Sequence, residues 1–228
     1  MGLLDRDFGL TSGERVSTIR IDDIPPDHIA RYEFAADALA DLPGPLVGAD
    51  IFCGSGYGTH LLAQRLPCFI TGIDGSPDAI ARAAEHYIDF NVLFSYKLFP
   101  FSLPANHFDF IVSMESIEHV EQGESFFRLL VHALKPGGRL VISAPNADVV
   151  NLDKNPYAWH YRHYTVDEIK QLAADCQLKL LQWMGADCTL IDSQGKVVSG
   201  NYYSPVSGAL KPGHLGDTQT YLFEKPRA

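Results

Sequence analysis

The stretch "DIFCGSGYG", Asp50–Gly58, follows an apolar run and places glycines at the alternate positions Gly54, Gly56 and Gly58. A glycine has no Cβ, so its backbone can adopt positive φ and lets another group approach closely. The apolar run before the glycines is strand-like, and the residues after them have helical spacing. The glycines are therefore predicted to lie in a strand-to-helix turn, where a ligand could contact bare backbone.

Strand-like and helix-like segments alternate along the chain around this turn. Short apolar runs rich in β-branched and aromatic residues predict buried parallel strands at 46–52, 68–74, 91–96, 108–114 and 138–144. Helical spacing predicts helices at 57–66, 77–88 and 122–134. This alternation predicts an α/β fold, a Rossmann-like, doubly wound and mostly parallel sheet in a three-layer αβα arrangement.

Local signals predict helix ends and the organisation of the chain. Ser76 is a predicted N-cap, and Thr165 with Glu168 has the spacing of a capping box. We expect a single domain over residues 1–228. It divides into a cap segment with a helical pattern, the sheet core, and C-terminal strands with a loop, at 1–45, 46–185 and 186–228. The short strands expected at 189–200 and 218–225 would add an antiparallel edge to the sheet.

Composition limits the partners of this fold. The chain has 18 Lys and Arg against 28 Asp and Glu, a formal charge of -10, without a basic cluster, which disfavours nucleic acid as a partner. We recognise no signal peptide and no stretch long enough to span a bilayer, so we expect no membrane partner, a cytoplasmic location and a monomer or homodimer. The four cysteines lack CxxC spacing and are expected to be core residues.

Asp74 lies at the tip of the second predicted strand, twenty residues after Gly54. A carboxylate at this place can accept two hydrogen bonds from a ribose diol, which suits any ligand that contains adenosine. A dinucleotide fingerprint needs Gly or Ala at position 59, where this chain has Thr59. The pattern therefore disfavours NAD as the ligand.

Several separated blocks resemble the class I S-adenosylmethionine (SAM)-dependent methyltransferases. Asp50 with the GxGxG turn looks like their first motif, and "GIDGSPDAIARA" looks like the second, with its ribose-binding acid. The blocks "FDFIVSMESIEHV" and "LKPGGRLVISAPN" are similar to those of the branch that includes ubiquinone-pathway and sugar O-methyltransferases. The resemblance covers roughly residues 28–185, and the order of the blocks makes it specific.

The resemblance implies that SAM binds over the glycine turn of the core. Carried onto this chain, it implies cofactor contacts at Tyr32, Cys53, Gly54, Ser55, Gly56, Tyr57, Asp74, Gly75, Ser76, Leu98 and Met114. Two positions depart from the family pattern. Phe52 stands where Gly or Ala is usual, so its ring must point away from the cofactor or narrow the pocket. Lys97 stands near the place of the usual adenine-binding acid.

We expect histidines to act on the methyl acceptor. A hydroxyl acceptor must lose its proton as the new bond forms, and a neutral histidine can remove it near neutral pH. His119 and His163 are the predicted general bases, with His160 as a further candidate, and the aromatic segment 155–165 with Arg162 is the predicted acceptor loop. The alternative is a loop that only packs its rings on the sheet. No metal is expected, because no acidic cluster accompanies His160 and His163 in their segment.

We therefore expect a SAM-dependent methyltransferase whose acceptor is a small molecule, with an oxygen of a sugar or other secondary metabolite as the first choice. Two alternatives stay open. One is methyl transfer to nitrogen or carbon on the same fold. The other is a SAM-binding regulatory protein without catalysis, which Phe52 and the missing adenine-side acid would suit.

Overall fold

The computed structural model describes residues 16, 18, 20–155, 158–189, 191–194, 196–198 and 209–227. Its strands are β1 (Leu46–Ile51), β2 (Cys68–Asp74), β3 (Val92–Tyr96), β4 (Phe108–Ser113), β5 (Leu134–Pro145), β6 (Lys179–Ala186), β7 (Lys211–Pro212) and β8 (Thr218–Glu224). Its helices are α1 (Pro26–Leu39), α2 (Tyr57–Arg65), α3 (Pro77–Tyr87), α4 (Gly123–Ala133) and α5 (Val166–Asp175), with 3₁₀ turns η2 (Ile21–Asp23) and η3 (Ile117–His119).

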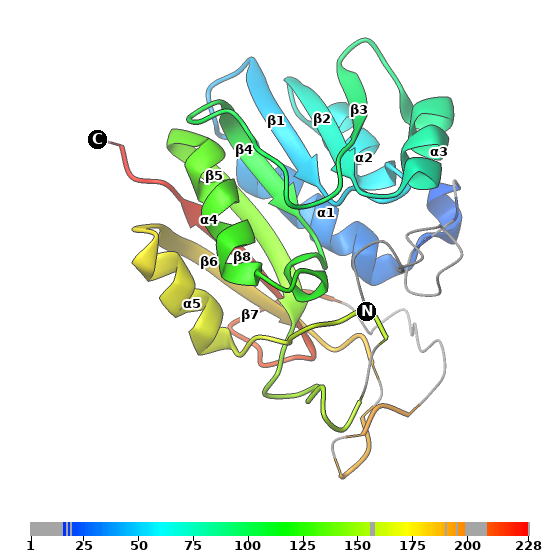
Figure 1. The fold of residues 1–228 in the computed structure, drawn as a ribbon, viewed down its shortest axis with the longest axis vertical. Coiled ribbons are helices and arrows are strands. Elements are labelled where there is room, and N and C mark those ends of the chain that lie inside the picture. Colours follow the sequence, from blue (N-terminus) through cyan, green and yellow to red (C-terminus); the bar gives the residue numbers. More distant parts are fainter. Residues whose placement is uncertain are drawn as a thin grey trace.

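The strands form one sheet in the order β3-β2-β1-β4-β5-β8-β6-β7 (Figure 1). Strands β1 to β5 pair in parallel, whereas β8 is antiparallel to both β5 and β6. The predicted mostly parallel sheet with an antiparallel C-terminal edge is confirmed. The strand order reverses at β1, which lies between β2 and β4, so the carboxyl end of β1 is the switch point where open α/β sheets bind ligands.

Two apolar cores fill the spaces between the sheet and its helices. Neighbouring residues of one strand enter opposite cores, as Ile111 does on one face of β4 and Phe110 and Val112 do on the other. Helices α4 and α5 cover the face of Ile111, in front of the sheet in Figure 1, and α1, α2 and α3 cover the opposite face. This arrangement explains the nearly continuous apolar runs of the central strands, which are buried on both faces.

The local signals agree with the observed helix ends. Each predicted helix between the strands begins and ends within one residue of the observed one. The Ser76 hydroxyl accepts a hydrogen bond from the Ala79 amide at 3.2 Å and so caps α3. Thr165 and Glu168 form the reciprocal capping box of α5. Both caps act within one helical turn, so their residues alone are enough to predict them.

Four parts of the sheet differ from the expectation, the first being the short β7, which lies where a loop was expected. β5 begins at Leu134, directly after α4, and not at residue 138. β6 was not predicted, because its first residues are exposed and its last ones buried, so the sequence shows no alternation of period two. Of the two strands expected at 189–200, the described residues show an isolated antiparallel bridge between Ile191 and Val197.

Two expectations from composition can be compared with the structure. All four cysteines are free thiols, with Cys53 and Cys68 buried and Cys176 and Cys188 partly buried. Among the described residues, no helix has the length and apolar character that crossing a membrane requires.

Gly58, the last glycine of the quoted stretch, is required by the packing of α1 on α2. A Cβ at this position would lie 2.0 Å from Cζ of Tyr32, whose ring is buried between the two helices. The ring also meets Tyr57 edge to face, with 5.6 Å between centroids. This glycine therefore makes room for a side chain of the protein itself.

We expect Gly58→Ala to lower the free energy of unfolding by about 1–3 kcal/mol, because the added methyl group overpacks the site against Tyr32. Urea denaturation measures the change. In a Tyr32→Ala background the clash is gone, and the same substitution should cost little, since alanine favours helix. An equal loss in both backgrounds would contradict this account of Gly58.

Candidate active site

Gly54 and Gly56 form the turn between β1 and α2 and have φ angles of +56° and +88°. A Cβ on Gly56 would lie 2.6 Å from the Ala83 side chain and 2.9 Å from the Phe94 ring, so this glycine packs against protein. A Cβ on Gly54 would meet no atom within 4 Å. Of the three glycines, Gly54 is thus the one that borders open space, and a ligand can approach its backbone there.

Asp74, the last residue of β2, lies beside Gly54. Its Oδ2 accepts a hydrogen bond from the Gly54 amide at 3.0 Å, and its Oδ1 accepts one from the Ser76 amide at 2.8 Å. A carboxylate has about four acceptor positions, so these bonds are compatible with a ribose diol at the same group. The predicted pair of an open glycine and a carboxylate at neighbouring strand ends is therefore brought together, and it fits an adenosine-containing cofactor.

Asp50 supports the glycine turn through hydrogen bonds to two neighbouring side chains. It is fully buried in β1 and accepts hydrogen bonds from the Thr59 hydroxyl at 2.7 Å and the Tyr32 hydroxyl at 3.2 Å. Burial raises the pKa of Asp50 to about 7, the two hydrogen bonds oppose this rise, and the charge of Asp74 adds to it. Thr59, the residue that breaks the dinucleotide fingerprint, thus binds the carboxylate that supports the turn.

The other side chains predicted near the turn are buried in contacts with protein. The Ser55 hydroxyl donates to the Val16 carbonyl at 3.1 Å, and the Tyr57 hydroxyl bonds to Nδ1 of His28 at 2.9 Å. Cys53 is buried in the turn itself. These contacts give the side chains a role in holding the turn, whatever their backbone atoms bind.

Phe52, the departure from the family pattern, has a φ of +65°, which is uncommon for a residue with a side chain. Its ring lies 5.1 Å from the ring of Phe126 in α4. None of its atoms is within 4 Å of a Cβ placed on Gly54. The Phe52 ring therefore points into the core, away from the open space at Gly54, and does not narrow it.

The predicted adenine side lies at the carboxyl ends of β2 and β3. A Cβ on Gly75 would lie 3.0 Å from Cδ1 of Leu98, so these two residues are adjacent. The Lys97 amide donates to the Asp74 carbonyl at 2.9 Å, which holds the chain leaving β3 close to β2. Met114, directly after β4, is buried in the core shared by α1 and α2.

A buried charged cluster beside the turn was missed by the sequence analysis. Asp27 and Arg31 of α1 form an ion pair at 3.1 Å, with both side chains almost fully buried. Next to them is Glu115, whose Oε1 accepts from the Ser143 hydroxyl at 2.6 Å. Burial raises the pKa of Glu115, and the charge of Arg31 opposes the rise. The signal available in the sequence was the i, i+4 spacing of the opposite charges of Asp27 and Arg31 in α1.

The histidines of the acceptor side form a chain of hydrogen bonds. The buried His163 contacts the Val150 carbonyl through Nδ1 and Nδ1 of His160 through Nε2, both at 2.7 Å. Burial lowers the pKa of His163, and it lowers the pKa of His160 to about 3, so both rings are neutral at pH 7. A carbonyl only accepts, so Nδ1 of His163 donates and its Nε2 accepts from His160. The lone pair of the His160 ring is therefore on Nε2.

His119 lies next to this chain, and its ring centroid is 4.7 Å from that of His160. Its Nδ1 donates to the Trp159 carbonyl at 3.1 Å, so any lone pair of the ring is on Nε2, which lies 3.9 Å from Oε1 of Glu118. The His119 side chain is 28% exposed. Of the two predicted general bases, His119 can thus be reached from solvent, whereas His163 lies behind His160.

Arg162, predicted to bind the acceptor, contacts protein groups. Its guanidinium is paired with Glu168 of the α5 capping box and lies 4.7 Å from the ring centroid of Tyr164. Tyr164 is buried in the core under α4 and α5. This end of segment 155–165 therefore follows the packing alternative, and residues 156–157 of the segment lie outside the described residues.

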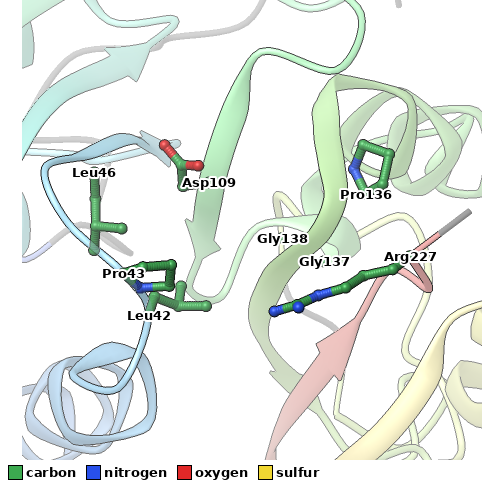
Figure 2. Close-up of a pocket in the computed structure, with 8 residues that line it drawn as sticks. All are labelled: Leu42, Pro43, Leu46, Asp109, Pro136, Gly137, Gly138 and Arg227. Carbon is green, nitrogen blue, oxygen red and sulfur yellow. The ribbon is translucent and has the colours of Figure 1, made fainter.

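A separate cavity of about 260 Å³ lies at the amino ends of the parallel strands, opposite the glycine turn (Figure 2). Its lining consists of Leu42, Pro43, Leu46, Asp109, Pro136, Gly137, Gly138 and Arg227. Leu46 begins β1, so the cavity is at the amino end of the strand that carries the glycine turn at its carboxyl end. Asp109 is already bound to Lys135 at 2.8 Å. We assign this cavity no part in the site.

Comparison with known proteins supports the resemblance seen in the sequence. Residues 49–142, which contain the glycine turn, Asp74 and β4, match the family described as a methyltransferase domain. The chain is thus similar to the class I SAM-dependent methyltransferases in this region and has their fold. A solved SAM-dependent methyltransferase from Mesorhizobium loti shares its fold, with a TM-score of 0.65 and 18% identity over 87% of this chain and 99% of that one.

Two groups of curated relatives match this chain. A ubiquinone biosynthesis O-methyltransferase from Aeromonas salmonicida is 26% identical over 82% of this chain and 80% of its own length. Phosphoethanolamine N-methyltransferase 3 from Arabidopsis thaliana is 33% identical over 47% of this chain and 22% of its own length. The chain thus spans about a fifth of the length of the phosphoethanolamine enzymes that it matches.

The raised pKa of Asp50 predicts a pH dependence of stability. The unfolded carboxyl ionises near its ordinary pKa of 3.8 and the folded one near 7. The folded state therefore holds its proton over this range while the unfolded state releases it, and stability should fall as pH rises from about 4 to 7. Asp50→Asn removes the titration, so its urea midpoint should fall less over this range than that of the wild type. Parallel pH profiles of the two proteins would contradict the assignment.

Proposed function

We propose that this methyltransferase transfers the methyl group of SAM to an oxygen atom of a small-molecule acceptor, such as a sugar or another secondary metabolite. The observation that carries the proposal is the open backbone of Gly54 beside the Asp74 carboxylate at the switch point of the sheet. Gly75 and Leu98 continue this surface toward the adenine side, and Met114, buried directly after β4, is the remaining predicted contact. These residues would hold the cofactor.

The roles of the chain follow from what SAM supplies. Bound SAM carries a methyl group that its sulfonium sulfur already activates. The protein then has to orient the acceptor, exclude water and receive the acceptor's proton. His119 is the candidate for contact with the acceptor, because it is partly exposed and the Trp159 carbonyl directs its lone pair to Nε2. His163 acts through His160 as a positioning residue.

Oxygen is preferred as the acceptor atom for two reasons. A ubiquinone biosynthesis O-methyltransferase matches the greater part of both chains, and histidines suited to a hydroxyl acceptor lie at the ligand edge of the sheet. The phosphoethanolamine N-methyltransferases support nitrogen as the second candidate, and identification of the methylated product distinguishes the two. The non-catalytic alternative loses one of its grounds, since the Phe52 ring points into the core. We also propose a cytoplasmic monomer or homodimer.

We expect the protein to bind SAM and S-adenosylhomocysteine but not NAD in calorimetry. Asp74→Ala should weaken SAM binding by about 1.5–3 kcal/mol, the scale for losing hydrogen bonds to a charged group. Asp109→Ala is the matched control, because Asp109 also accepts from a backbone amide, that of Val47, but at the opposite edge of the sheet. The control should lose stability and keep its SAM affinity. Tight NAD binding without a SAM signal would refute the cofactor assignment.

We expect His119→Ala to lower kcat about 10²–10⁴-fold with SAM affinity unchanged, since the histidine acts on the acceptor and not on the cofactor. A screen of acceptors with labelled SAM provides the assay. His132→Ala, an exposed histidine in α4, is the control and should keep its rate. Wild-type kcat in His119→Ala would remove His119 from the reaction.

A further inference from the structure

Two segments far apart in the sequence bring a carboxylate and two imidazoles together. Glu118 and His119 come from η3, which follows β4, and His160 comes from the loop that follows β5. Each residue offers one possible ligand atom, and these atoms all lie within 4.8 Å of one another. Glu118 is 1% exposed, and the two histidines are partly buried.

We propose that Glu118, His119 and His160 bind a divalent transition-metal ion. From the sequence no metal is expected, because no acidic cluster accompanies His160 and His163 in their own segment. The structure instead supplies Glu118 from the neighbouring strand end. Its backbone carbonyl also accepts from the Tyr161 amide at 2.8 Å, which ties the His160 loop to η3.

The surroundings of both histidines are those of metal ligands. A ligating histidine usually donates its second ring N–H to a carbonyl or another acceptor, which fixes the tautomer and the orientation of the ring. His119 donates from Nδ1 to the Trp159 carbonyl. His160 donates from Nδ1 to His163, which is held in turn by the Val150 carbonyl. Both rings thus present Nε2 as the basic nitrogen.

The donor set selects the class of ion. Two imidazoles and one carboxylate suit Zn²⁺, Fe²⁺, Mn²⁺ or Co²⁺, whereas Ca²⁺ and Mg²⁺ prefer oxygen ligands. Three protein ligands also leave coordination positions open for a further molecule. The proposed site is therefore of the open kind and not a closed structural one.

The ion would specify the acceptor, and this step rests on the proposed function. A bound hydroxyl becomes more acidic on a metal ion and can release its proton to solvent near neutral pH. More than one open position favours an acceptor with two neighbouring oxygen atoms, such as a vicinal diol. His119 would then act on the acceptor through the ion that it holds, so the rate loss expected for His119→Ala stays the same.

The test is metal binding by the full chain, freed of any affinity tag and stripped with chelator. Calorimetric titrations with Zn²⁺, Mn²⁺ and Mg²⁺, without acceptor, should show one Zn²⁺ or Mn²⁺ per chain. Glu118→Gln and His160→Ala should each weaken this binding at least about tenfold, and His163→Gln about 10–100-fold through loss of orientation. His132→Ala should bind as the wild type does.

SAM titrations on the same samples separate this inference from the proposed function. Unchanged SAM binding in Glu118→Gln, together with lost metal binding, supports the site and shows that the variant is folded. Wild-type protein that binds SAM but no transition ion overturns the metal site and leaves the proposed function standing. Equal metal affinity in the wild type and Glu118→Gln, or a response to Mg²⁺ alone, also overturns it. Absorption bands of Co²⁺ in wild-type protein provide a check that does not depend on any variant.

Discussion

The buried carboxylate of Asp50 is the constraint on which the ligand edge of this fold depends. It joins the end of β1 to α1 through Tyr32 and to α2 through Thr59, so a single group sets how both helices meet the strand. A buried carboxylate without such donors would be costly, and an apolar residue in its place would leave both hydroxyls without an acceptor. The turn is joined to β2 by separate hydrogen bonds, from the Gly54 amide to the Asp74 carboxylate and from the Phe52 and Cys53 amides to the Ile73 carbonyl.

Each of the three glycines Gly54, Gly56 and Gly58 suits its position for a different physical reason. Gly58 admits the ring of Tyr32, Gly56 combines positive φ with close packing on Ala83 and Phe94, and Gly54 borders open space. In the sequence they look equivalent, because a missing Cβ leaves the same trace whatever comes close to it. Of the three glycines, Gly54 is therefore the one whose backbone is open to a ligand.

The acceptor side shows how the rigid sheet positions residues that are irregular in sequence. η3 and the loop after β5 both leave the carboxyl edge of adjacent parallel strands, and the carbonyls of Val150 and Trp159 orient the histidines there. Loops placed by a rigid scaffold commonly carry function. On the same scaffold Arg162 is paired with Glu168 in the capping box of α5, whereas the sequence predicted that it binds the acceptor.

The sequence by itself determined the alternation of β1 to β5 with the helices between them, the caps of α3 and α5, and the pairing of a glycine turn with Asp74. These features rest on local periods, on caps within one turn, or on the rule that parallel strands present their carboxyl ends at one edge. The tertiary structure alone decided the direction of the Phe52 ring, the burial of Asp27 with Arg31, and the grouping of Glu118, His119 and His160. Each of these depends on which distant segments come into contact, and no local pattern records that, because the burial and hydrogen bonds of a side chain are set by neighbours remote in the chain.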